Sequence, residues 1–109
     1  MNALIASLEK LLGTPRDGAL LRYSLGNAWL KAGEAAKAAG FLREAVGKDP
    51  GYSAAWKLLG RALDESGNAP EALQAFRDGI QAARSKGDKQ AEKEMVVFAR
   101  RIEKSLRGD

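Results

Sequence analysis

The sequence contains two copies of a 34-residue unit, at residues 19–52 and 53–86. Placing one copy on the other aligns seven identical pairs: Leu25 with Leu59, Gly26 with Gly60, Ala28 with Ala62, Gly33 with Gly67, Ala35 with Ala69, Ala38 with Ala72 and Arg43 with Arg77. A period of this size is typical of helical repeats, in which each unit buries its apolar face against its neighbours. The period therefore predicts a stack of helices that presents a surface to other proteins.

The spacing of the apolar residues predicts an all-α fold of about six helices with no strands. The expected helices cover residues 2–13, 17–31, 34–48, 52–66, 68–83 and 88–106, joined by short turns. Asp17, Asn68 and Asp88 each lie at the start of a helix and are expected to accept hydrogen bonds from its first-turn amides. Gly26 and Gly60 lie within helices, which indicates that a neighbouring helix packs closely against each of them.

The composition argues against most kinds of catalytic site. The sequence has no cysteine and no histidine, so disulfides, thiol nucleophiles and histidine-based catalysis or metal binding are excluded. It also has no glycine-rich phosphate loop and no calcium-binding loop. We therefore expect a protein that is not an enzyme and that has no cofactor.

The hydropathy of the chain predicts no association with a membrane. No run approaches the roughly 18 consecutive apolar residues of a membrane-spanning helix. The first residues also lack the basic start and long apolar run of a signal peptide. A cytoplasmic location is the expectation.

The repeated unit resembles the tetratricopeptide repeat, whose pattern is W-x2-L-G-x2-Y, then A-x3-F-x2-A, then P. The second copy matches this pattern at Trp56, Leu59, Gly60, Ala72 and Phe76, and the first at Leu25, Gly26, Ala38, Ala45 and Pro50. The copies depart from it where Arg22 replaces the tryptophan, Leu63 the tyrosine, Gly79 an alanine and Arg84 the proline. The resemblance implies one domain over residues 1–109, with a half repeat at 2–16, repeats at 19–52 and 53–86, and a capping helix at 88–107.

This resemblance implies a non-catalytic module that binds a peptide or a helix of another protein. In this family the first helices of successive units line a concave groove. Carried onto this chain, the groove positions include Tyr23, Asn27, Lys31, Lys57, Arg61 and Met95. Some family members hold a terminal carboxylate with a lysine and two asparagines. Here Asn27 matches one asparagine, but Tyr23 and Leu58 replace the other two residues, so we expect no clamp of that type.

An alternative function is nucleic-acid or anionic-surface binding through the basic C-terminal segment. The formal net charge is +4, and residues 84–107 contain eight basic and four acidic residues. The candidate basic face consists of Lys89, Lys93, Arg100, Arg101 and Lys104. The interspersed acids favour a solvated helix face, and no nucleic-acid recognition motif is present. Another protein is therefore the expected partner, and we expect a monomer or a weak homodimer.

Overall fold

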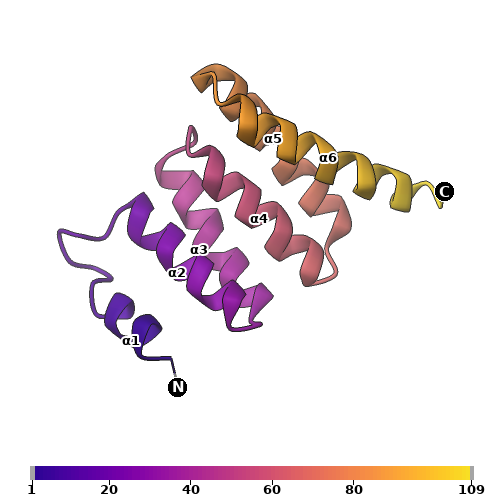
Figure 1. The fold of residues 1–109 in the computed structure, drawn as a ribbon. Helices are drawn as coiled ribbons and strands as arrows, with labels where there is room; N and C mark the ends of the chain where they lie inside the picture. The colour runs from indigo at the N-terminus through magenta and orange to yellow at the C-terminus, as the bar shows by residue number, and fades with distance from the viewer. Residues whose placement is uncertain (1, 109) are drawn as a thin grey trace.

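The computed structural model describes residues 2–108, which form six α-helices and no strand. The helices are α1 (Ala3–Glu9), α2 (Ala19–Lys31), α3 (Ala35–Lys48), α4 (Ser53–Glu65), α5 (Ala69–Lys86) and α6 (Lys89–Leu106). They follow one another along a molecule of 44 × 30 × 19 Å, with the two termini at opposite ends (Figure 1). The predicted all-α fold is confirmed. Within residues 2–108 no helix is both long enough and apolar enough to cross a membrane.

Helices α2 and α3 form one closely packed pair, and helices α4 and α5 form a second. A glycine lies at the centre of each pair. A Cβ atom on Gly26 would overlap the side chain of Leu42, and one on Gly60 would lie 2.5–2.7 Å from three ring atoms of Phe76. Non-bonded carbon atoms normally lie about 3.5–4.0 Å apart. The predicted close approach at both glycines is confirmed.

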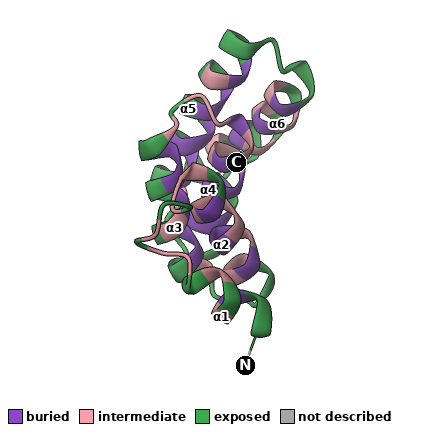
Figure 2. Cartoon of the chain, turned by 90° about the vertical axis from the view of Figure 1, so that its left-hand side faces the viewer, coloured by how far each residue is buried: buried purple, intermediate pink, exposed green. Residues whose placement is uncertain are grey.

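The apolar interior consists of two clusters. The larger cluster extends from α3 to α6 and includes the fully buried Leu42, Phe76 and Met95. The smaller cluster, at the N-terminal end, consists of Ile5, Leu21, Leu25 and Ala28. Figure 2 shows the buried positions between the helices, while the N-terminal end and the turn between α5 and α6 are exposed. Helix α1 therefore shares little of the main core.

Helix α1 is shorter than the helix predicted over residues 2–13. Its last residue is Glu9, and turns follow in which the Leu11 amide donates to the Leu8 carbonyl at 3.0 Å. Gly13 then adopts a φ of 77°, a left-handed conformation that glycine adopts at little cost. The apolar spacing of residues 2–13 is compatible with both a helix and turns, which explains why the predicted helix is too long.

The prediction that Asp17 caps α2 is wrong. The N-cap residue is Gly18, with no side-chain hydrogen bond to the helix. The Asp17 carboxylate instead accepts from the Gly13 amide at 2.9 Å and pairs with the Arg22 guanidinium at 2.8 Å. A charged guanidinium is a stronger partner for a carboxylate than a neutral amide is, and it lies within reach.

Helix α5 is longer than predicted and ends at Lys86 instead of residue 83. Helix α3 ends before an Asp-Pro-Gly sequence, whereas no proline or glycine occurs between residue 80 and Gly87, which directly follows α5 and has a φ of 71°. As a result α5 has 18 residues and α3 has 14. Helix α6 therefore does not continue the 34-residue register of the two units before it.

The two remaining predicted caps differ from each other. The Asp88 carboxylate accepts a hydrogen bond from the Ala91 amide at 3.1 Å, which confirms the cap of α6. Asn68 is the N-cap residue of α5, but its side chain makes no capping hydrogen bond, so that part of the prediction is wrong. The first turn of α5 contains a proline, which has no amide hydrogen and reduces the number of donors that need a cap.

Candidate functional site

A pocket of about 320 Å³ lies between α4 and α6. It is lined by Lys57, Arg61, Glu94, Val97, Phe98 and Arg101, and is called the α4/α6 pocket below. Lys57 of α4 and Glu94 of α6 form an ion pair with an N–O distance of 2.9 Å. The hydrogen bond from Lys57, together with a weaker one from Gln90, holds the pKa of the Glu94 carboxyl below its ordinary value. The pair links the two helices across the pocket.

Two guanidinium groups in the α4/α6 pocket have no acidic partner among residues 2–108. Arg61 is exposed and forms no ion pair, and Arg101 lies over the Phe98 ring with its guanidinium carbon 5.9 Å from the ring centroid. Phe98 in turn stacks on Phe76 at 5.2 Å with an interplanar angle of 12°, which fixes the ring at the pocket wall. By contrast, four other arginines form ion pairs with acids: Arg22, Arg43, Arg77 and Arg84. The pocket therefore combines unbalanced positive charge with apolar surface.

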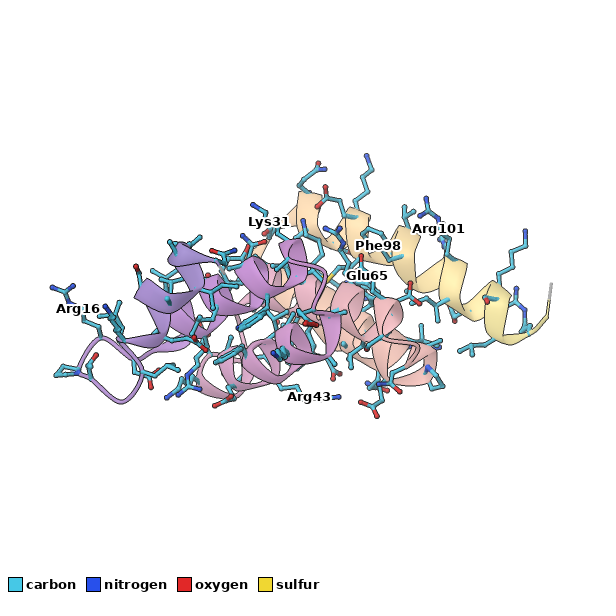
Figure 3. The ribbon with its side chains drawn as sticks, turned by 90° about the horizontal axis from the view of Figure 1, so that it is seen from below. Arg16, Lys31, Arg43, Glu65, Phe98 and Arg101 are labelled. Atoms are coloured by element: carbon cyan, nitrogen blue, oxygen red, sulfur yellow. The ribbon has the colours of Figure 1, made fainter. Side chains whose placement is uncertain are left out.

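Helix α2 contributes three of the predicted groove residues. Tyr23 and Asn27 are partly buried and Lys31 is exposed. The Tyr23 ring lies 4.9 Å from the Tyr52 ring, next to α4, and burial raises the pKa of the Tyr52 hydroxyl. Figure 3 shows Lys31 on the same side of the molecule as Phe98 and Arg101, with Arg43 of α3 on the opposite side. Helix α2 thus extends the side of the molecule that carries the pocket.

The prediction that Met95 lines the groove is wrong. Its side chain is fully buried, and its sulfur would lie 2.5 Å from a Cβ atom on Gly79. Helix α5 is longer than α3 and α6 begins two residues later than the 34-residue period places it, so Glu94, Val97 and Phe98 line the pocket with α4. Glu94 and Val97 of the pocket were not among the predicted groove residues. Arg84 was the available signal, since it replaces the proline that would have ended α5 earlier.

The five residues of the predicted basic face do not lie together. Lys89, Lys93 and Arg100 line a hollow on the outer side of α6, whereas Arg101 lines the α4/α6 pocket. Lys104 is exposed in the last turn of α6. The basic segment therefore divides between two surfaces. Among the described residues, no group of three or more acidic side chains is placed to hold a metal ion.

Stacked pairs of helices that share the same glycine contact define the protein as a helical-repeat scaffold. Residues 29–91 match the family model described as tetratricopeptide repeat. The chain belongs to the tetratricopeptide repeat family. Proteins of this family are generally non-catalytic scaffolds that mediate protein–protein interaction.

Individual relatives agree with this assignment. The chain is 48% identical over 102 residues to the TPR repeat-containing protein PA0015 of Pseudomonas aeruginosa, covering 94% of this chain and 97% of that protein. It resembles the solution structure of protein BPP2914 from Bordetella parapertussis, with 41% identity, a TM-score of 0.80, and coverage of 97% and 94% of the two chains. It also resembles the Sgt2 TPR domain from Aspergillus fumigatus, with 28% identity, a TM-score of 0.79, and coverage of 94% of this chain and 68% of that one.

Proposed function

We propose that this protein is a non-catalytic module that binds a peptide or helix of another protein on the surface formed by α2, α4 and α6. The observation that supports this proposal is the pair of unpartnered guanidiniums, Arg61 and Arg101, beside Val97 and Phe98. A charged group without a partner can form a strong hydrogen bond to an incoming carboxylate. The preferred ligand is therefore a segment that carries an acidic side chain close to a bulky apolar one.

Each residue of the α4/α6 pocket has a distinct role in this proposal. Arg61 and Arg101 donate hydrogen bonds to the carboxylate, and Phe98 contacts the apolar side chain of the ligand. Lys57 is engaged by Glu94, so it acts mainly by keeping the two helices at a fixed distance. The remaining ligand residues extend along α2, where Tyr23, Asn27 and Lys31 supply aromatic and polar contacts. Residues 2–16 and 88–107 cover the two ends of the repeats at 19–52 and 53–86.

The test is an array of synthetic peptides that vary in the number and spacing of acidic and apolar residues. We expect peptides with an acidic residue next to a bulky apolar one to bind best. Exchanging both arginines for glutamate (Arg61→Glu with Arg101→Glu) should weaken that binding by at least about tenfold, since each guanidinium–carboxylate bond contributes about 1.5–3 kcal/mol.

A matched control carries the same charge change at a distant place. Lys10→Glu with Arg16→Glu alters two exposed residues near the N-terminal end that form no ion pairs. This control should bind as the wild type does, and circular dichroism should show that both double variants are folded. Equal binding by the pocket variant and the control would contradict the proposal.

A further inference from the structure

The outer side of α6 is a helix face that no other described element covers. Helix α4, packed between α3 and α5, buries seven residues, whereas α6 buries four: Ala91, Met95, Ala99 and Ile102. The opposite side of α6 has a shallow hollow of about 670 Å³. We call it the α6 outer face and define it by Lys89, Lys93, Val96, Val97 and Arg100. Val97 lines both this hollow and the α4/α6 pocket, and its side chain is 46% exposed.

The charges around this face are not balanced within the protein. Lys89, Lys93 and Arg100 form no ion pair with any described residue. Glu92 also lines the hollow, but its carboxylate is held by the Arg84 guanidinium at 2.7 Å. The result is an apolar strip surrounded by three free cations, which favours an acidic and partly apolar ligand.

The spacing of these residues identifies the shape of the ligand. Steps of four, three and four residues join Lys89, Lys93, Val96 and Arg100 in one straight stripe parallel to the helix axis, and Val97 lies beside it. Such a stripe matches the side of a second helix, which packs with its axis about 8–10 Å away. We propose that the α6 outer face binds an acidic amphipathic helix of a different protein. Its apolar residues contact Val96 and Val97, and its carboxylates accept hydrogen bonds from Lys89, Lys93 and Arg100.

A second copy of this chain does not supply such a helix. Helices α2, α3, α5 and α6 each carry a net positive charge, and α4 is neutral. Helix α1 has a single acid, but it is only seven residues long. Nucleic acid fits less well than an acidic helix, because phosphates would leave Val96 and Val97 uncovered and no aromatic side chain lines the hollow.

The probe for this proposal is a synthetic amphipathic helix with alanine and leucine at heptad positions a and d and glutamate at e and g. A scrambled peptide of the same composition has the same charge but no apolar stripe. Fluorescence anisotropy of labelled peptides measures binding to the full chain, and heparin and anionic vesicles are tested as alternative ligands. We expect the helical probe to bind at least about tenfold more tightly than the scrambled peptide, a difference of about 1.4 kcal/mol.

Variants separate this surface from the α4/α6 pocket. Lys93→Glu with Arg100→Glu should abolish most of the binding of the helical probe. Arg61→Glu with Arg101→Glu should weaken it far less, although the probe also places leucine beside glutamate and can reach the α4/α6 pocket. The control at Lys10 and Arg16 should leave it unchanged. Amide NMR shifts on adding the probe should occur mainly along α6. A failure here leaves the pocket proposal intact, because that proposal depends on Arg61→Glu with Arg101→Glu and not on Lys93→Glu with Arg100→Glu.

Several outcomes would overturn the proposal. They are the absence of binding by the helical probe, equal binding of the scrambled peptide, and binding that survives Lys93→Glu with Arg100→Glu. Tighter binding to heparin or to anionic vesicles than to the helical probe would instead identify the face as a general polyanion or membrane contact. Val97→Ser is a milder second variant that keeps the charge. It should weaken binding of the helical probe but not binding of heparin.

Discussion

The two helix pairs of this protein share one packing contact but differ in the side chains around it. In α2–α3 the contact is Gly26 against Leu42, and in α4–α5 it is Gly60 against Phe76. An aliphatic side chain can rotate away from a new neighbour, whereas a packed aromatic ring cannot do so easily. The comparison indicates that the glycine allows the two helices to approach closely. The side chain packed against it, Leu42 or Phe76, determines how far the helices can move apart when that side chain is crowded.

The pairs also differ at the position where the family pattern has tryptophan. In the second pair Trp56 occupies it, and its indole nitrogen donates to the Pro50 carbonyl at 2.8 Å. In the first pair Arg22 occupies it and binds Asp17 and Glu44 at 2.8 and 2.6 Å. This position therefore holds an aromatic side chain in the second pair and a charged one in the first, so the two pairs should respond differently to pH and salt.

The largest expected effect comes from removing the partner of each glycine. Phe76→Ala should lower the free energy of unfolding by about 3–5 kcal/mol, because it leaves a cavity in the main core. Leu42→Ala removes a smaller buried side chain and should cost less. Urea denaturation measures both values, and Phe76→Leu serves as a milder variant if Phe76→Ala does not fold. A greater loss for Leu42→Ala would contradict the comparison.

The next effect comes from adding a methyl group at each glycine. Gly60→Ala should destabilise the fold by about 1–3 kcal/mol, since the new carbon overlaps the Phe76 ring. Gly26→Ala should cost less, because the Leu42 side chain can move. Both changes improve helix propensity by about 1 kcal/mol, so this gain cancels when the two variants are compared. Thermal unfolding of the two variants provides the measurement, and equal losses would show that the aromatic ring is no stricter than leucine.

The charged first pair should lose stability in acid. The hydrogen bond from Arg22, with help from the Gly13 amide, lowers the pKa of Asp17 from 3.8 to about 2. A carboxyl with a lowered folded-state pKa stabilises the fold above its unfolded pKa, and this stabilisation is lost as the pH falls from near 3.8 to 2. Asp17→Asn should therefore be less stable than wild type at pH 7, and the gap should close toward pH 2.

Trp56→Phe provides the control for that experiment. It removes the hydrogen bond to Pro50 but no titrating group, so its stability difference from wild type should stay constant over the same pH range. Chemical denaturation at several pH values measures both differences. A pH-independent gap for Asp17→Asn would show that the Asp17–Arg22 pair contributes nothing to stability.

The smallest effect concerns how each unit is joined to the next. Tyr23 contacts Tyr52, whereas Lys57, at the equivalent position of the second unit, pairs with Glu94. Double-mutant cycles should give a coupling of about 0.5–1.5 kcal/mol for the tyrosines, independent of salt. The coupling of the partly exposed ion pair should decrease as salt rises, because mobile ions screen it. Salt dependence in the tyrosine pair would contradict this distinction.

The fold was predictable because the repeat period, the helix spacing and the two glycines all point to the same arrangement. These signals depend on contacts within a unit, which a sequence pattern records directly. The α4/α6 pocket was less predictable because it depends on the register between α5 and α6. That register is set by where α5 ends. Gly87 marks this end, but the residues just before it, Arg84 to Lys86, are compatible with both helix and turn, so the last turn of α5 was not predicted. Arg61, predicted as a groove residue, is exposed and lines the pocket, whereas Met95, predicted for the same groove, is buried.

The sequence also could not show which charges are free. Lys57 and Arg61 are equally plausible anion-binding residues when only their spacing is known. The structure distinguishes them, since Glu94 neutralises Lys57 and leaves Arg61 unpaired. Such pairing depends on residues more than thirty positions apart, and no local pattern encodes it.

The separate N-terminal cluster of apolar residues has a consequence for local unfolding of the protein. Helix α1 has seven residues and buries only Ile5, so little free energy holds it to α2. In a linear array of repeats, units that contact only one neighbour unfold first. Amide protons of α1 should therefore exchange with deuterium well before those of α4, which has neighbours on both sides. The chain should therefore unfold first at α1, while α4 and α6, which together line both hollows, stay folded.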